Sequence, residues 1–115
     1  MVTCATVISA TEYCIGYRYW GEYDGTNFYL TKDGGKTWTK LAPETAIPKE
    51  ITSDMRYAEA AEVYYENDRL VVQVSCKTES GNPWSIEAKL ESEDLGDTWT
   101  MVRSWGQRDD GTPIE

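Results

Sequence analysis

The sequence predicts an all-β protein, and three observations support this fold class. A pattern of the form Ser/Thr-x-Asp-x-Gly-x-Thr-Trp occurs twice, and it combines turn-forming residues with residues that favour a strand. Segments rich in Val, Ile, Thr and Tyr have the length of strands and lie between clusters of turn-forming residues. The two halves of the chain also match each other in the spacing of these segments. Each half therefore reads as four antiparallel strands.

The repeated pattern is made of residues that nucleate a turn. Its first copy contains Thr31, Asp33, Gly35, Thr37 and Trp38, and its second contains Ser92, Asp94, Gly96, Thr98 and Trp99. A short aspartate accepts hydrogen bonds from backbone N–H groups just after it, and the glycine adopts the positive φ that the turn requires. Thr-Trp then resumes a strand, and we expect both indoles to be largely buried beside their turns. Replacing either indole by alanine would then cost about 3–5 kcal/mol.

In the first half, strands are expected at about 3–9, 13–20, 27–31 and 37–42. Turn signals separate them at Thr11-Glu12, at Asp24 to Asn27 and in the repeated pattern. The segment from Cys14 to Trp20 is apolar or aromatic at most positions, and so is the later segment from Leu70 to Val74. This composition predicts sheets that are covered on both faces.

In the second half, strands are expected at about 58–65, 69–77, 84–92 and 98–105, with turns at Asn67-Asp68 and at Ser80 to Pro83. Residues 43–56 contain Pro43 and Pro48 and form a connector, with one short helical turn around Lys49 to Asp54. Residues 106–115 are polar and are expected to form a loop or a disordered end, or to add a strand to a neighbour.

The repeated pattern resembles the Asp-box, or BNR repeat, of sialidases and related β-propeller proteins. The resemblance implies that each half is a propeller-like blade in which the Asp-box joins the third strand to the fourth. The chain is then expected to be a single domain over 1–115, with a first blade at 1–42, a connector at 43–56, a second blade at 57–105 and a tail at 106–115.

Two blades are too few for a propeller, which takes about four to eight to close a ring. An unclosed pair exposes sheet faces and edges, which favours association. We expect self-association into a ring. The alternatives are a small two-sheet sandwich or a piece of a longer protein.

Composition excludes several classes of function. The net charge of −9 argues against direct binding to nucleic acid, because phosphate contacts need a cationic surface. The absence of His removes Ser-His and Cys-His nucleophile pairs and imidazole metal sites. Cys4, Cys14 and Cys76 have unrelated spacings, so we expect packed, reduced thiols, although a Cys4–Cys14 bridge is conceivable. No segment has the length of a membrane span or the pattern of a signal peptide, which predicts a cytoplasmic protein, or a secreted one whose signal has been removed.

The expected function is a non-enzymatic binding or interaction module that recognises a protein or glycan partner. Aromatic side chains are typical anchors of such surfaces. The candidate binding surface consists of Trp20, Tyr23, Arg56, Tyr57 and Trp84. One alternative is a small acidic inhibitor that blocks a basic nucleic-acid-binding surface.

A second alternative, a fragment or subunit of a sialidase-like hydrolase, follows only from the resemblance. That family binds a carboxylate with three arginines, the first of which lies in an Arg-Ile-Pro motif. The nearest match here is Arg56-Tyr57-Ala58, which keeps only the arginine. We therefore expect no catalytic, cofactor-binding or metal-binding residues.

Overall fold

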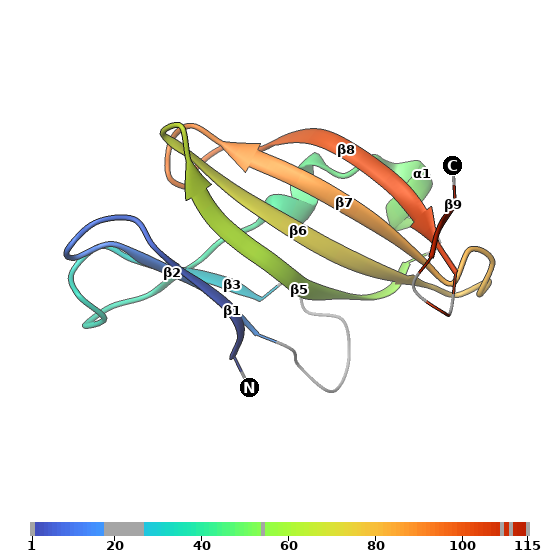
Figure 1. The fold of residues 1–115 in the computed structure, drawn as a ribbon, viewed down its shortest axis with the longest axis horizontal. Helices are drawn as coiled ribbons and strands as arrows, with labels where there is room; N and C mark the ends of the chain where they lie inside the picture. The colour runs from blue at the N-terminus through green and yellow to red at the C-terminus, as the bar shows by residue number, and fades with distance from the viewer. Residues whose placement is uncertain (1, 18–26, 54, 109, 111, 115) are drawn as a thin grey trace.

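The computed structural model describes residues 2–17, 27–53, 55–108, 110 and 112–114, and at residues 3 and 57 only the backbone is considered. These residues form two antiparallel sheets, which confirms the all-β fold class. In Figure 1 the first sheet lies below one end of the second, and the helical turns of the connector lie behind the second sheet. The arrangement is compatible with a small two-sheet sandwich, and the described residues do not form a propeller ring.

The first sheet has the order β1-β2-β3-β4. Its strands are β1 (Val2–Val7), β2 (Tyr13–Tyr17), β3 (Phe28–Thr31) and β4 (Thr39–Lys40). The last strand is shorter than the expected 37–42. The reason is local, because the backbone N–H of Thr37 donates to Asp33 Oδ1 at 2.9 Å and is not available to the ladder.

The second sheet has the order β5-β6-β7-β8-β9. Its strands are β5 (Met55–Glu66), β6 (Arg69–Thr78), β7 (Ser85–Ser92), β8 (Thr100–Gln107) and β9 (Pro113–Ile114). The β5–β6 hairpin turns at Asn67 and Asp68, whose φ angles of 53° and 60° are those of a tight primed turn. The register then pairs Glu66 with Arg69.

The tail differs from the expected loop or donated strand. β9 turns back on its own sheet and pairs with the end of β8, so that Ile114 lies opposite Gly106. Asp110 stabilises the turn between β8 and β9, because its Oδ1 accepts hydrogen bonds from the backbone N–H of Thr112 at 3.0 Å and from Thr112 Oγ1 at 2.7 Å. A short aspartate two residues before its partner is a common way to close such a turn.

The connector contains a 3₁₀ turn η1 (Pro43–Ala46) and a short helix α1 (Lys49–Thr52), which agrees with the helical turn expected there. Its apolar side chains point into the molecule, since Leu41 and Ile47 are each only 5% exposed. These side chains join a core formed by the inner faces of both sheets. The buried residues of the sheets include Cys14, Phe28, Leu30, Leu70, Val72, Val74, Ala88 and Leu90.

The two sheets differ in how far the side chains on their two faces are buried. Along β6 the side chains are buried at most positions, as expected for a strand at the centre of its sheet. Along β2 the burial alternates between buried and half-buried, so the expectation of cover on both faces is wrong for the first sheet. Cys14 and Gly16 face the core, while Tyr13, Ile15 and Tyr17 face outward. The first sheet thus has one inner and one outer face.

The first sheet packs against β5 through β1 and β2, and the backbone of Gly16 in β2 comes close to Ala60. A Cβ at this position would lie 2.7 Å from Ala60 Cβ in β5 and 2.8 Å from both Cys4 Sγ and Phe28 Cε1. Each of these separations is well below van der Waals contact. The absence of a side chain at Gly16 is therefore what allows β2 to pack against β5.

We predict that Gly16→Ala destabilises the protein by about 1–3 kcal/mol, because the new methyl group overpacks the contact between the sheets. Gly106→Ala is the matched control, since the nearest atoms to its Cβ would be in the ring of Pro83, at 3.3 Å and 3.4 Å, and Ile114 Cβ at 3.7 Å, all farther than the contacts at Gly16. Urea denaturation of both variants measures the difference. Equal stability of the two variants would contradict the close packing of β2 on β5.

Candidate functional site

The two copies of the repeated pattern form loops with the same hydrogen bonds, and we call them the aspartate loops (residues 31–38 and 92–99). In the first loop, Asp33 Oδ1 accepts from Thr31 Oγ1 at 2.8 Å and from the backbone N–H of Thr37 at 2.9 Å, and Asp33 Oδ2 accepts from Thr37 Oγ1 at 2.6 Å. The hydroxyl of Thr31 in turn accepts from the backbone N–H of Gly35 at 2.9 Å. Hydrogen bonds from side chains of the loop itself therefore stabilise the turn.

The second aspartate loop repeats this network. Asp94 Oδ1 accepts from Ser92 Oγ at 2.6 Å and from the backbone N–H of Thr98 at 2.8 Å, and Asp94 Oδ2 accepts from Thr98 Oγ1 at 2.6 Å. The backbone N–H of Gly96 donates to Ser92 Oγ at 2.8 Å. Gly96 has a φ of 93°, close to the 97° of Gly35 in the first loop. The two loops share one geometry as well as one sequence pattern.

The hydrogen bonds determine the charge state of both aspartates. Bonds from Thr37 and Thr31 hold the pKa of Asp33 at about 2, and bonds from Ser92 and Thr98 do the same for Asp94. A carboxylate with so low a pKa is a poor proton carrier near neutral pH. The geometry therefore suits a structural role for these aspartates.

The two tryptophans of the loops have different surroundings. Trp99 is partly buried and packs against the core, and its Nε1 is buried without a hydrogen-bond partner among the described residues. Trp38 is 42% exposed, so the expectation that both indoles are largely buried is wrong for the first loop. The second loop is covered by Leu41, which would lie 2.7 Å from a Cβ at Gly96. At Gly35 the nearest atom to such a Cβ belongs to Trp38 itself, at 3.8 Å.

A second feature of the structure is an exposed tryptophan between two hollows. Trp84 is 51% exposed and lies just before β7. The larger hollow has a volume of about 370 Å³ and the smaller one about 50 Å³. Gly81, Asn82, Pro83, Trp84, Arg108 and Ile114 line the larger hollow, and Arg56, Lys77, Thr78 and Trp84 line the smaller one. We call Trp84 with Arg56, Lys77 and Arg108 the Trp84 site.

The loop that carries Trp84 is closed by its own hydrogen bonds. Thr78 Oγ1 donates to the carbonyl oxygen of Pro83 at 2.6 Å and accepts from the backbone N–H of Gly81 at 3.0 Å. Gly81 has a φ of 73°, which a glycine adopts without strain. A turn held at both ends presents the indole in a defined orientation.

The smaller hollow has a cation that is positioned by a buried carboxylate. Glu87 of β7 is only 4% exposed, and it accepts hydrogen bonds from Ser75 Oγ at 2.7 Å and Ser85 Oγ at 3.1 Å. Lys77 Nζ donates to the same Ser75 hydroxyl at 3.0 Å. The guanidinium of Arg56 makes no side-chain hydrogen bond or ion pair with the part of the chain that the structure describes.

The larger hollow is lined by the C-terminal hairpin. Arg108 Nη1 donates to the carbonyl oxygen of Pro113 at 3.0 Å and to Thr112 Oγ1 at 3.3 Å, which holds the guanidinium over the turn. Hydrogen bonds from Thr112 lower the pKa of Asp110, and the nearby positive charge of Arg108 adds to this effect. The pairing of β7 with β8, which sets Ser85 opposite Gln107, brings Arg108 to Trp84, and the β9 turn then holds its guanidinium.

The structure brings together only part of the binding surface expected from the sequence. Arg56 and Trp84 line the same hollow. Trp20 and Tyr23 lie outside the described residues, as does the side chain of Tyr57. Sequence reasoning missed Lys77 and Arg108. Strand register is the signal that could have found them, because Ser85, next to Trp84, pairs with Lys77 on one side and with Gln107, next to Arg108, on the other.

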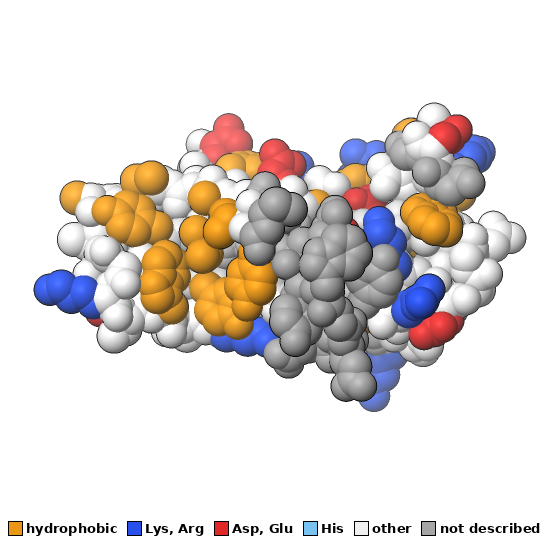
Figure 2. Space-filling view, turned by 90° about the horizontal axis from the view of Figure 1, so that it is seen from below, with side chains coloured by type: hydrophobic (Ala, Val, Ile, Leu, Met, Phe, Trp, Pro, Cys, Tyr) orange, Lys and Arg blue, Asp and Glu red, His pale blue; other side chains and the backbone are white. Residues whose placement is uncertain are grey.

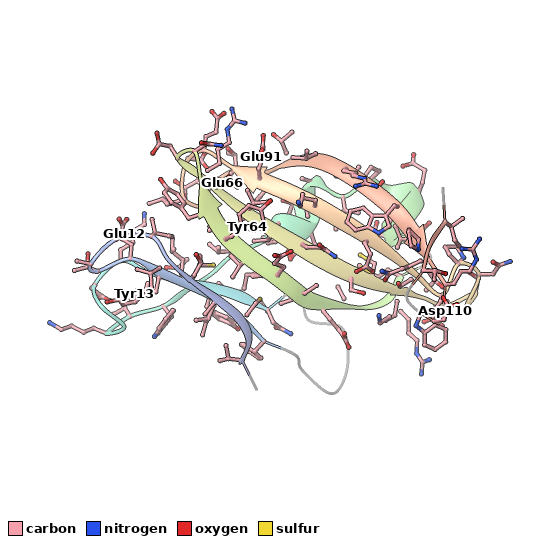
Figure 3. The ribbon with its side chains drawn as sticks, in the orientation of Figure 1. Glu12, Tyr13, Tyr64, Glu66, Glu91 and Asp110 are labelled. Atoms are coloured by element: carbon pink, nitrogen blue, oxygen red, sulfur yellow. The ribbon has the colours of Figure 1, made fainter. Side chains whose placement is uncertain are left out.

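The outward face of the second sheet carries charges of both signs. Arg69 forms ion pairs with Glu91 at 3.3 Å and with Glu93 at 3.1 Å. Lys89 lies 5.4 Å from the ring centre of Tyr64, and Arg103 lies 4.8 Å from that of Trp105. In Figure 3, Glu66 and Glu91 lie at one end of this sheet, and Asp110 lies at the opposite end. Positive side chains thus alternate with the acidic ones.

Other reactive groups are well separated or buried. Cys4, Cys14 and Cys76 form no disulfide with the described residues, and burial raises the pKa of Cys14 and of Cys76 to about 12, which keeps both of these thiols protonated at neutral pH. Among the described residues no cluster of three or more metal-ligating side chains occurs. The described part of the chain also contains no helix long and apolar enough to cross a membrane.

We predict that the stability of the protein falls as the pH is lowered from about 4 to about 2, because Asp33 and Asp94 have folded-state pKa values of about 2 against an ordinary value of 3.8. Their contribution is present above the ordinary pKa and is lost as the pH falls through the lowered one. Urea midpoints between pH 5 and pH 2 should show a weaker pH dependence in the Asp33→Asn/Asp94→Asn variant than in Asp97→Asn. An equal dependence would contradict the assignment.

We also predict that Trp99→Ala costs about 3 kcal/mol and Trp38→Ala about 1 kcal/mol or less, because only the first substitution removes contacts with the core. Thermal unfolding of the two variants measures the difference directly. A larger loss in Trp38→Ala than in Trp99→Ala would show that the exposed indole is covered in solution.

Comparison of the chain with models of known protein families finds no match, and comparison with the sequences of characterised proteins finds none either. The resemblance to Asp-box proteins therefore rests on the ten residues of the two motifs. The shared hydrogen bonds of the aspartate loops explain why these residue types recur, and they carry no information about activity.

Proposed function

We propose that this chain is a non-enzymatic binding module that recognises an acidic saccharide, or an acidic segment of a protein partner, at the Trp84 site. The observation that carries the proposal is the 51% exposed indole of Trp84 between two hollows that are lined by basic side chains. An exposed indole on a rigid turn offers a flat apolar surface on which a sugar ring or an apolar side chain stacks.

The basic residues of the Trp84 site favour a ligand with a localised negative charge. Arg56 and Lys77 line the smaller hollow, whose volume of about 50 Å³ suits a single small polar group such as a carboxylate. A guanidinium and an ammonium both donate charge-assisted hydrogen bonds to such a group. The larger hollow of about 370 Å³, bounded by Arg108, leaves room for the ring or chain that carries it.

The overall charge of the protein limits the choice of ligand. A chain with a net charge of −9 repels long polyanions, because their charges extend beyond the local basic residues. A short ligand with one anionic group meets only the Trp84 site. A saccharide or a peptide segment is therefore favoured over nucleic acid as the ligand.

The two alternative functions have less support. An inhibitor that imitates nucleic acid would need a continuous acidic row, whereas Arg69, Lys89 and Arg103 interrupt the acidic residues of the second sheet. A sialidase-like enzyme would need three converging arginines. Arg69 is engaged with Glu91 and Glu93, and Arg103 lies over Trp105, so neither contributes to the Trp84 site.

We predict that Trp84→Ala weakens binding at the Trp84 site about tenfold or more, because truncating a tryptophan that anchors a ligand typically costs about 2 kcal/mol. The probes are uronate-bearing oligosaccharides, matched neutral oligosaccharides and a short glutamate-rich peptide, each titrated calorimetrically into the 115-residue chain.

Trp38→Ala is the matched control, because Trp38 is similarly exposed, at 42%, and lies outside the Trp84 site. It should bind as the unmodified chain does. Loss of binding in both variants, or in neither, would contradict the proposal. Arg56→Gln separates the two contributions, because it should reduce the preference for acidic over neutral probes and leave stacking intact.

A further inference from the structure

We infer that the outer face of the first sheet is an interface between two copies of this chain. This face is formed by side chains that alternate with the core residues of β1, β2 and β3. Its apolar members include Val2, Ala5, Val7, Tyr13, Ile15 and Tyr29. Val7 is 69% exposed and Val2 is 55% exposed, which are high values for valines in strands.

Figure 2 shows hydrophobic side chains gathered over the end of the molecule that contains β1, β2 and β3. Within this face, Tyr17 and Tyr29 stack with ring centres 5.5 Å apart, and the hydroxyl of Tyr17 lies 3.3 Å from that of Tyr29. Rings that are already held against each other lose little conformational freedom on binding, so they form a ready contact surface.

The distribution of charge indicates why the partner is a second copy. Residues 1–42 carry four acidic and four basic side chains. Residues 43–115 carry sixteen acidic and seven basic side chains, which accounts for the whole net charge of −9. A contact between two first sheets therefore joins the charge-balanced halves of the two molecules. A contact through the second sheets would join their acidic halves.

The spacing of packed sheets makes this arrangement favourable. Face-to-face sheets lie about 10 Å apart, so four layers in the order second, first, first, second place the two acidic sheets about 30 Å from each other. This separation is several times the Debye length of about 8 Å at physiological ionic strength. Repulsion between the acidic sheets is then largely screened, while apolar area is buried at the centre.

The outer face of the first sheet is small for a protein–protein interface. Strands of four to six residues give a face well below the roughly 800 Å² per partner of a standard stable interface. The dimer is therefore expected to be weak and to depend on concentration. It is independent of the Trp84 site, which lies on the second sheet and its loops.

The test is sedimentation velocity of the intact chain from about 10 µM to about 1 mM, a range that brackets a weak dissociation constant. The average mass should rise from the monomer value of 13.1 kDa toward twice that value. Val7→Glu should raise the dissociation constant about tenfold or more, since it places a charge within an apolar contact. Val7→Thr, a milder change of similar shape, should raise it less.

Val102→Glu is the matched control, because Val102 is 53% exposed on β8 of the second sheet. It should dimerise as the unmodified chain does, and circular dichroism establishes that each variant is folded. Raising the salt concentration from about 0.01 M, where the Debye length is about 30 Å, to about 0.15 M should strengthen the dimer by screening the acidic halves. The inference would be overturned if the mass stays that of the monomer over the whole range, if Val7→Glu and Val102→Glu weaken the dimer equally, or if added salt weakens the dimer.

Discussion

The contact between β2 and β5 at Gly16 is the constraint on which the rest of the structure depends. Two small sheets form a common core only if their inner faces approach closely, and Gly16 leaves room for Ala60 where a side chain would not fit. Phe28 and Cys14 are fully buried beside this contact. The same contact decides which side of the first sheet is covered, so it also leaves the outer face of that sheet exposed.

The hydrogen bonds of the aspartate loops are local, whereas the burial of their tryptophans depends on tertiary contacts. Their hydrogen bonds run between residues at most four apart, and they are the same in both copies within about 0.2 Å. The tryptophan that ends each loop depends instead on its neighbours. Trp99 packs on the core, whereas Trp38 is 42% exposed, although the backbone N–H of Gly34 in its loop donates to the carbonyl oxygen of Thr11 at 2.9 Å. One local motif therefore has two energetic roles.

The Trp84 site and the outer face of the first sheet divide the surface of a strongly acidic chain into parts with different physical properties. At the Trp84 site, Arg56, Lys77 and Arg108 come from β5, from β6 and from the chain just after β8, so a local basic cluster arises within the acidic half. The outer face of the first sheet is apolar and belongs to the charge-balanced half. A module with both features can bind a small acidic group at one end and associate through the other.

The sequence by itself determined the all-β class, the two turns built on Asp33 and Asp94, and most strand positions, because turn chemistry and the alternation of side chains act over a few residues. It also selected Arg56 and Trp84. Only the tertiary structure decided the exposure of Trp38, the pairing of β9 with β8, and the arrival of Arg56 and Arg108 at Trp84. These features depend on which elements pack together, and Arg56 and Arg108, which lie 28 and 24 positions from Trp84 in the sequence, reach it only through the pairing of strands.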